Sequence, residues 1–415
     1  MKSNLKKINE KTLIVAVDLG KLKHVCRFIS ISGFESKPIS IYNNRASFEQ
    51  LWQKALMYKS ANNLDTIMLG VEPTGSYGFA LMEFFKNKGA EIRLVNPMHT
   101  KRLKDMIGNS PQKTDEKDPL VIGDILKLGR GLNMVMPVGV IADLRHLVNT
   151  RENILEDINR VKNHLESLIC IYFPEFFNVM KNLRTKTSIY ILKRYPFPKD
   201  IVKVGKEKLT EEIRKVSRGQ IKAENVTCLY ECANNSIGVK QGHQGIKVEI
   251  KMLLDQHDLL EQQKQNIEKT IRQQVVRVPY MKIITSIKGI KEISAAAIIA
   301  EVADFMAFRG TKEVEKLAGL NLFEISSGKH RGEKHISKRG RPLLRKTLFF
   351  ITLNLVRKNG VFHHEYQNHR FKGMPGPKAL TAISRKLLRT IYAMIRDNKS
   401  FDKHYIKTKQ NKMVA

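Results

Sequence analysis

Two long amphipathic segments place the strongest constraint on how this chain can fold. In residues 140–171, and again in residues 246–276, apolar side chains recur at three- and four-residue steps with charged residues between them. That period predicts two helices of about thirty residues each, which pair either as an antiparallel or intermolecular coiled coil or within an ordinary helical bundle. The two segments enclose an insert at about 173–244 that carries no interpretable motif.

The part of the chain before residue 135 alternates between strand and helix patterns. Strands are expected at residues 13–19, 25–31, 38–42, 66–71 and 91–95. Helices are expected after Ser47, a candidate N-cap with Gln50 three residues on, at residues 77–88, and from about Asp115 onward. This order predicts an α/β domain in which the first three strands form a meander.

The charge of the chain limits the kind of partner it can have. Its 415 residues include 73 Lys and Arg against 40 Asp and Glu, a formal net charge of +33. A surplus of that size indicates a polyanionic partner, nucleic acid before a membrane surface. The apolar run 13–17 is too short for a signal peptide, and no segment reaches the roughly 18 apolar residues of a membrane span. We therefore expect a cytoplasmic, nucleoid-associated protein.

Four acidic residues are candidates for metal chemistry. Asp18 ends the first predicted strand and Glu72 follows the fourth. Asp115 and Asp118 are three residues apart, so on a helix their carboxylates share one face, roughly 5–6 Å apart at Cβ. Each acid alone is more commonly an ordinary strand-end or first-turn residue. If the first and fourth strands are neighbours, however, the positions converge and suit a divalent cation.

The C-terminal part carries the strongest nucleic-acid signals. Gly289 separates a short apolar segment from a helix of small residues, as in a helix-hairpin-helix whose turn lets backbone amides approach a phosphate. A loop-rich stretch at 319–340 follows, and helices are expected at 341–358 and 378–396. The densest basic patch, opposed only by Glu333, comprises Lys329, Arg331, Lys334, Lys338, Arg339, Arg341, Arg345 and Lys346. His363, His364 and His369 lack the spacing of a metal site.

Several of these motifs resemble a known family. The segments are Val17-Asp18, Val71-Glu72-Pro73-Thr74-Gly75, and Lys113-Thr114-Asp115 with Asp118. In this order they resemble the Asp-Glu-Asp-Asp (DEDD) transposases of the IS110 insertion-sequence group, Piv-like invertases included. The likeness continues in the Gly289 hairpin and at Ala318-Gly319-Leu320, Ser327-Gly328, Ile336-Ser337-Lys338-Arg339-Gly340 and Arg385-Lys386-Leu387-Leu388. It implies an RNase-H-like N-terminal domain similar to the RuvC Holliday-junction resolvase.

The resemblance also implies a chemistry. Asp18, Glu72, Asp115 and Asp118 would hold one or two Mg²⁺ ions, which neutralise the scissile phosphate. Ser327 would be the nucleophile that forms a covalent phosphoserine link to DNA, with Ser326 and then Ser337 as the other candidates. The nucleic-acid contacts would come from Gly289, Lys329, Arg331, Lys338, Arg339, Arg341, Arg345, Lys346, Arg385 and Lys386.

The family further implies a structured guide (bridge) RNA that pairs with donor and target DNA, and a homodimer or homotetramer. The expected domains are a RuvC-like catalytic domain at 1–135, a long-helix coiled-coil region at 136–279, a helical C-terminal transposase domain at 280–398, and a basic tail at 399–415. The chain departs from the family pattern at Pro119, at 374–377 and in the long insert. The alternatives are a metal-dependent junction endonuclease, which uses water as its nucleophile, and a nucleic-acid-binding protein without catalysis.

Overall fold

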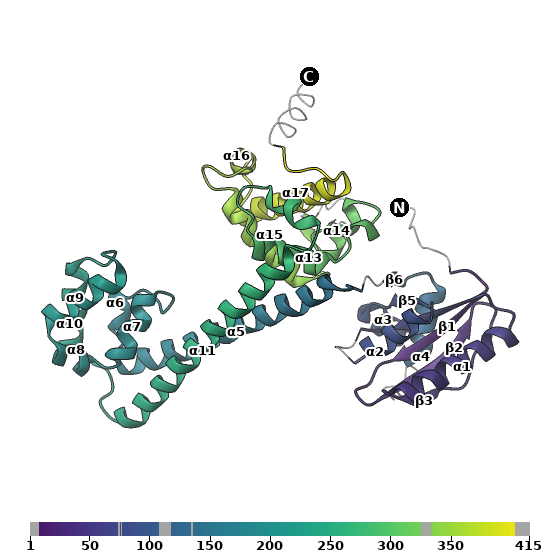
Figure 1. Cartoon of the computed structure of the whole chain (residues 1–415), viewed down its shortest axis with the longest axis horizontal. Coiled ribbons are helices and arrows are strands. Elements are labelled where there is room, and N and C mark those ends of the chain that lie inside the picture. The colour runs from purple at the N-terminus through teal and green to yellow at the C-terminus, as the bar shows by residue number, and fades with distance from the viewer. Residues whose placement is uncertain are drawn as a thin grey trace, which may run out of the picture. The chain divides into compact units, whose positions relative to one another are not determined.

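The chain folds into two compact units, Met1–Val135 and Met136–Ala415 (Figure 1). The computed structural model describes residues 8–73, 75, 77–107, 118–133, 136–324, 332 and 334–402. None of the helices in these ranges is long and apolar enough to cross a membrane.

The N-terminal unit is built on a mixed sheet whose described strands have the order β3-β2-β1-β4-β5-β6. The strands are β1 (Thr12–Asp18), β2 (Lys23–Ser30), β3 (Ile39–Tyr42), β4 (Thr66–Val71), β5 (Glu91–Leu94) and β6 (Leu132–Asn133). The first three form the predicted antiparallel meander, whereas β4 runs parallel to β1 and β5 runs parallel to β4. The α/β character is confirmed, and β6, which pairs antiparallel to β5, was not expected.

The helices among the described residues of this unit are α1 (Arg45–Ala61), α2 (Phe79–Asn87), α3 (Pro97–Ile107) and α4 (Asp118–Lys127). The expected N-cap of α1 was wrong: Asn44 caps the helix, and its Oδ1 accepts the Ser47 N–H at 2.8 Å. Asn44 has the extended backbone that a capping side chain needs, while Ser47 already lies inside the first turn. Helix α3 was not predicted from the sequence.

Helix α4 packs closely on the sheet because a glycine lies at the contact on each side, Gly70 in the sheet and Gly123 in the helix. A Cβ on Gly70 of β4 would lie 2.1 Å from Leu126 Cδ1, and one on Gly123 of α4 would lie 2.3 Å from Ile29 Cδ1. Ile122 and Leu126, on the face of α4 that covers the sheet, are fully buried. The small residues therefore let α4 approach β1, β2 and β4.

The second unit contains the two long helices predicted from the sequence, α5 (Val140–Tyr172) and α11 (His243–Val275). They lie side by side in one chain (Figure 1). Arg151 Nη2 contacts Glu268 Oε1 at 2.8 Å, and His164 Nε2 contacts Glu249 Oε1 at 3.1 Å, so the helices run antiparallel. Coiled-coil packing along the pair stays a prediction.

The insert between the long helices is helical and has a core of its own, which includes Phe173, Phe176 and Phe197. Its helices are α6 (Phe176–Val179), α7 (Lys186–Arg194), α8 (Pro198–Val204), α9 (Lys206–Ser217) and α10 (Ala223–Asn234).

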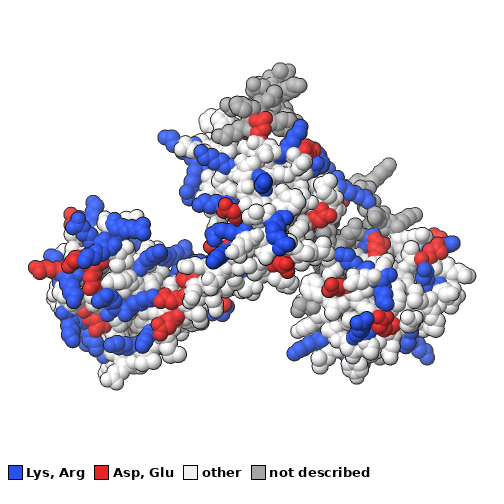
Figure 2. Space-filling model, viewed as in Figure 1, with Lys and Arg blue, Asp and Glu red and all other residues white. Residues whose placement is uncertain are grey.

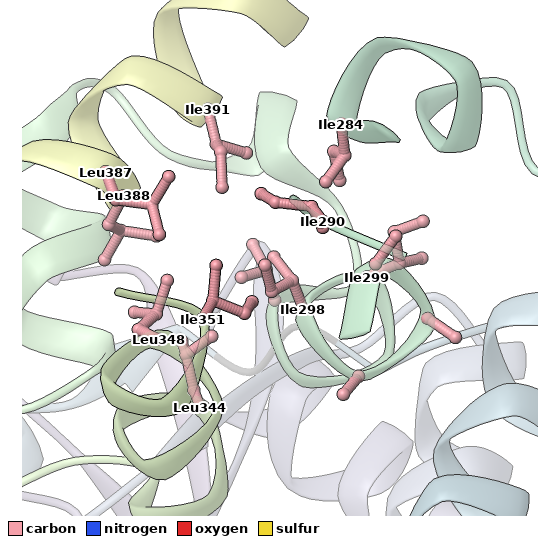
Figure 3. Close-up of a cluster of buried hydrophobic side chains, with 14 of the residues drawn as sticks. Ile284, Ile290, Ile298, Ile299, Leu344, Leu348, Ile351, Leu387, Leu388 and Ile391 are labelled. Atoms are coloured by element: carbon pink, nitrogen blue, oxygen red, sulfur yellow. The ribbon is translucent and has the colours of Figure 1, made fainter. Parts of the chain in front are cut away.

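At the other end of the long helices lies the C-terminal lobe. Its described elements are α12 (Tyr280–Thr285), α13 (Glu292–Val302), the 3-10 helix η1 (Phe305–Ala307), α14 (Thr311–Leu317), β7 (Leu322–Glu324), β8 (Lys334–Ile336), α15 (Pro342–Leu355), α16 (His363–Phe371) and α17 (Gly376–Arg396). Figure 3 shows the core of the lobe, where Ile298 of α13 lies beside Ile351 of α15, and Leu387, Leu388 and Ile391 of α17 belong to the same apolar cluster.

Arg145 of α5 connects the long helices to this lobe. Its Nε donates to the Ala300 carbonyl at 2.8 Å and its Nη2 donates to the Glu301 carbonyl at 3.3 Å. Both carbonyls belong to the last turn of α13, where no N–H of the same helix is available. Burial, and secondly the neighbouring Arg341, lower the pKa of Arg145 to about 10, so the guanidinium remains charged at neutral pH.

Leu126→Ala should destabilise the N-terminal unit. Leu126 is fully buried between α4 and the sheet, and its truncation leaves a cavity, so the free energy of unfolding should fall by about 2–5 kcal/mol. The fluorescence of Trp52, the one tryptophan of the chain, follows urea unfolding of this unit because its ring packs on Phe85.

The matched control is Leu128→Ala, two residues further on, where the side chain is 58% exposed. It should change the free energy of unfolding by no more than about 0.5 kcal/mol. Equal effects of the two substitutions would contradict the packing of α4 on the sheet.

Candidate functional site

Asp18 and Glu72 lie at the ends of two paired strands. In the parallel β1–β4 ladder Val17 is in register with Val71, and each acid is the next residue. Neighbouring strands are about 4.8 Å apart, and residues in register project to the same face of the sheet. The strand residues before Asp18 are buried, whereas Asp18 and Glu72 are only half-buried. Two carboxylates therefore lie at the same end of two adjacent, buried strands, as the sequence predicted for the case that these strands are neighbours.

Cys26 lies opposite Val17 on β2, close to Asp18. Burial, and secondly the charge of Asp18, raise the pKa of the Cys26 thiol well above its usual range. The thiol therefore stays protonated at neutral pH. Because metals and electrophiles are bound by the thiolate, Cys26 does not contribute to the chemistry of this edge.

Asp118 is the first residue of α4, which packs on the same strands. Its Oδ1 lies 2.6 Å from Lys104 Nζ of α3. Lys104 was not expected at this site from the sequence, because α3 itself was not predicted; the run of cations Lys101, Arg102 and Lys104 was the available signal. Lys104 supplies a counter-charge, and a cation bound by Asp118 would compete with it.

One of the four predicted metal-binding acids is not among the described residues. Asp115 lies outside them, and within the described ranges no three His, Cys, Asp or Glu side chains gather closely enough to hold a metal ion. The structure thus brings Asp18 and Glu72 to one sheet edge and places Asp118 on the covering helix. The complete Asp-Glu-Asp-Asp site stays a prediction.

In the C-terminal lobe, strands β7 and β8 form an antiparallel hairpin in which Phe323 pairs with His335. The segment between the strands contains Ser326, Ser327, Lys329 and Arg331, which lie outside the described residues. Ser337, the third candidate nucleophile, follows β8, and its Oγ donates to Asn321 Oδ1 at 2.6 Å. That bond gives the Ser337 hydroxyl a structural partner at the base of the hairpin.

Two glycines and an arginine close the base of this hairpin. A Cβ on Gly340 would lie 2.4 Å from both the Gly319 nitrogen and the Leu317 carbonyl oxygen, so two backbone segments touch here. The Lys338 N–H donates to the Gly319 carbonyl at 2.9 Å. Arg345 Nη1 donates to the carbonyls of Ala318 and Lys338 at 3.0 and 3.3 Å. The motifs at 318–320 and 336–340 therefore form one compact base beneath the hairpin.

The predicted nucleic-acid contacts divide into two groups. Four of them form ion pairs within the unit: Arg341 with Glu301 at 3.7 Å, Lys346 with Glu152 at 2.6 Å, Arg385 with Glu315 at 3.0 Å, and Lys386 with Glu365. Together with Arg345, these side chains also serve the fold. Lys338 and Arg339 are exposed and belong to no ion pair between described residues, so they are the better placed for phosphates.

Gly289 occupies the turn between α12 and α13 with a φ of +110°, a conformation that favours glycine. The exposed Lys288 and Lys291 flank it. An exposed turn with two cations beside it can contact a phosphate. Figure 2 shows Lys and Arg over much of the surface, most densely on the lobe of the insert, so basic residues are not confined to the predicted contacts.

Comparison with known proteins identifies two matching family models. Residues 15–174 match a model of DEDD transposases related to IS110, and residues 281–367 match a model of the IS116/IS110/IS902 transposase family. The first contains Asp18 and Glu72, and the second begins within α12 and ends within α16.

Curated relatives resemble almost the whole chain. A 43.6 kDa protein of insertion element IS110 from Streptomyces coelicolor is 20% identical over 94% of this chain and 95% of its own length. A 44.8 kDa protein of insertion element IS116 from Streptomyces clavuligerus is 22% identical over 93% and 95%. A 42 kDa protein of insertion element IS900 from Mycobacterium paratuberculosis is 22% identical over 69% and 72%.

Gly340→Ala should destabilise the second unit. The added methyl group meets backbone atoms that cannot rotate away, so we expect the free energy of unfolding to fall by about 1–3 kcal/mol in urea titrations followed by circular dichroism.

Gly245→Ala, within α11, is the control, because a Cβ there meets open space. It should leave stability unchanged or raise it by about 0.5–1 kcal/mol, since alanine is the better helix former. A Gly340→Ala variant as stable as the wild type would refute the close backbone contact.

Proposed function

The chain belongs to the IS110 family of DEDD transposases, and on this premise we propose that it cleaves and rejoins DNA strands by means of a metal-binding acidic site and a serine nucleophile. The observation that carries the proposal is the in-register end of β1 and β4, where Asp18 and Glu72 follow paired residues on adjacent strands. Such an enzyme acts on the DNA of the nucleoid, in the cytoplasm.

The acidic site suits a hard divalent cation. The donors are carboxylate oxygens, the ligand type that Mg²⁺ prefers, and Cys26 nearby stays a neutral thiol. We assign Asp18, Glu72, Asp115 and Asp118 as the ligands of Mg²⁺. When bound, the ion would neutralise the scissile phosphate and polarise the attacking oxygen. The order of the strands, with β1 between β2 and β4, supports an RNase-H-like domain.

Ser327 is our candidate nucleophile, with Ser326 as the alternative. Its Oγ would form a bond to phosphorus as the bond from phosphorus to the leaving oxygen breaks, so that the energy of the phosphodiester is kept for rejoining. The compact base formed by Gly319, Gly340 and Arg345 supports this role, because it anchors both strands, β7 and β8, that the segment with Ser327 connects in the sequence. A dimer or tetramer would let the acids of one subunit meet the serine of another.

We also infer that a guide RNA pairs with donor and target DNA, as the family resemblance implies. The surplus of 73 Lys and Arg over 40 Asp and Glu is large enough to serve RNA and DNA together. In that arrangement base pairing selects the sequence while the protein holds the backbones.

Asp18→Asn should abolish strand cleavage while DNA binding at fixed salt is retained. The amide keeps the shape of the carboxylate but removes a charged metal ligand, and a loss of several kcal/mol in the transition state corresponds to at least about a 100-fold lower rate. Cleavage of labelled element-end DNA on a gel measures the rate.

Asp65→Asn is the matched control. Asp65 precedes β4 at the opposite end of the strand from Glu72, and it contacts Lys11 at 3.6 Å on the surface. This variant should cleave at the rate of the wild type. Wild-type cleavage by Asp18→Asn would remove Asp18 from the site.

Ser327→Ala should abolish the covalent link between protein and DNA. The assay incubates the protein with labelled end-junction DNA, the RNA encoded beside the element and Mg²⁺, and seeks a band that survives boiling on a denaturing gel. Ser326→Ala is the control and should keep the band. Cleavage without a covalent band would favour a hydrolytic junction endonuclease, and loss of the band in Ser326→Ala alone would move the nucleophile to Ser326. The same assay without the RNA tests whether formation of the covalent band depends on a guide RNA.

A further inference from the structure

Helix α16 adds little to the core of the C-terminal lobe. None of its residues, His363–Phe371, is buried. It is held by a hydrogen bond between His363 Nδ1 and the Val356 carbonyl at 2.8 Å, by the ion pair of Glu365 with Lys386, and by Tyr366, which is partly buried against the core. Of its other residues, His369 is half-buried, whereas His364, Gln367, Asn368, Arg370 and Phe371 are exposed.

The last residue of α16, Phe371, is 93% exposed, more than the other large hydrophobic side chains of the described ranges. Phe305 and Phe362, in contrast, are almost completely buried in the core of the same lobe. A single exposed apolar residue is common in proteins. The neighbours of Phe371 and the rigidity of its backbone are what distinguish it.

The backbone that carries Phe371 is fixed by a complete Schellman motif. The Met374 N–H donates to the His369 carbonyl at 3.1 Å, the Gly373 N–H donates to the Arg370 carbonyl at 3.0 Å, and Gly373 has a φ of +77°. Arg370 Nη1 also donates to the Met374 carbonyl at 2.7 Å. The ring is therefore displayed from an ordered helix end, so less conformational entropy is lost when a ligand contacts it.

The charges around the ring have one sign. Arg370 and Lys372 flank Phe371 and are exposed, and Lys378 follows at the start of α17. Glu365 is the one acid between residues 363 and 378, and Lys386 neutralises it. Figure 2 shows Lys and Arg side chains along the edge of the lobe where Figure 1 has α16. An aromatic ring among cations matches a ligand with flat π-faces on an anionic backbone, which is a strand of nucleic acid.

We propose that Phe371 is a base-stacking residue for DNA: its ring stacks on an unpaired or opened nucleobase, while Arg370 and Lys372 contact the adjacent phosphates. This site rests on the proposed function as a DNA-cleaving enzyme, which has to separate and hold strands, and adds to it a contact outside the family signatures. Stacking on aromatic rings tolerates any base, so the site would hold strands without selecting their sequence.

The test uses single-stranded oligodeoxynucleotides that carry 5-iodouracil, which forms photo-crosslinks to aromatic rings stacked on it. Wild-type protein should yield a crosslinked peptide that contains Phe371. Phe371→Ala should lose that crosslink and bind the oligonucleotide about 10-fold more weakly at fixed salt. Phe371→Trp should restore affinity. Thermal stability should be unchanged, because the ring packs on little of the lobe.

Phe350→Ala is the matched control. Phe350 of α15 is 56% exposed, and Phe349 and Ile351 beside it carry no charge. Lys346, one turn earlier on the same helix, is paired with Glu152 at 2.6 Å. This variant should bind and crosslink as the wild type does.

Lys372→Gln should lower the slope of log affinity against log salt by about 0.7, as expected for one lost phosphate contact to a single strand, whereas Phe371→Ala should leave the slope unchanged.

Three outcomes would overturn the proposal. The first is wild-type affinity of Phe371→Ala together with a crosslink that maps to another segment. The second is a crosslink to Phe371 with an iodouridine oligoribonucleotide but not with DNA, which would assign the ring to RNA. The third is an equal effect of Phe350→Ala, which would indicate non-specific apolar contact. None of them bears on Asp18 or Ser327, whose own variants test the proposed function separately.

Discussion

The parallel pairing of β1 with β4 is the constraint on which the candidate site depends. The two strands are far apart in the sequence, yet one backbone ladder sets Val17 opposite Val71 and so brings the next residues, Asp18 and Glu72, to one edge. The ladder is stable because the side chains of β1 are buried on the sheet. Helix α4 covers them, and Gly70 and Gly123 allow it to pack closely on the strands. Two carboxylates can lie at the ends of such buried strands only where solvent or a bound cation stabilises their charge.

The second unit follows a different principle, in which long helices carry separate cores. α5 and α11 pair through contacts such as Arg151 with Glu268, and each end of the pair belongs to a distinct apolar cluster. Arg145 joins the pair to α13 by donating to the last carbonyls of that helix. Because those carbonyls have no partner within their own helix, the arginine satisfies groups that would otherwise be costly to bury.

Basic residues in this chain have two roles: some bind groups within the fold, and others are exposed to solvent. The net charge of the sequence does not distinguish the two. Arg345 donates to carbonyls at the hairpin base, and Arg385 pairs with the buried Glu315. Lys338 and Arg339 are exposed beside the same base, and Arg370 and Lys372 flank an exposed ring on α16. A positive charge held by a buried acid contributes to the fold, whereas one that faces solvent remains available to a polyanion.

The sequence by itself determined β4 and the long helices α5 and α11, which lie where apolar spacing indicated, because the periods of strands and helices are local properties. It also determined the family, through short motifs in a fixed order. Only the tertiary structure decided that β1 and β4 are neighbours, that Asn44 rather than Ser47 caps α1, and that Lys104 meets Asp118. Those facts depend on contacts between segments distant in the chain or on backbone angles at one residue, and neither leaves a periodic trace in the sequence.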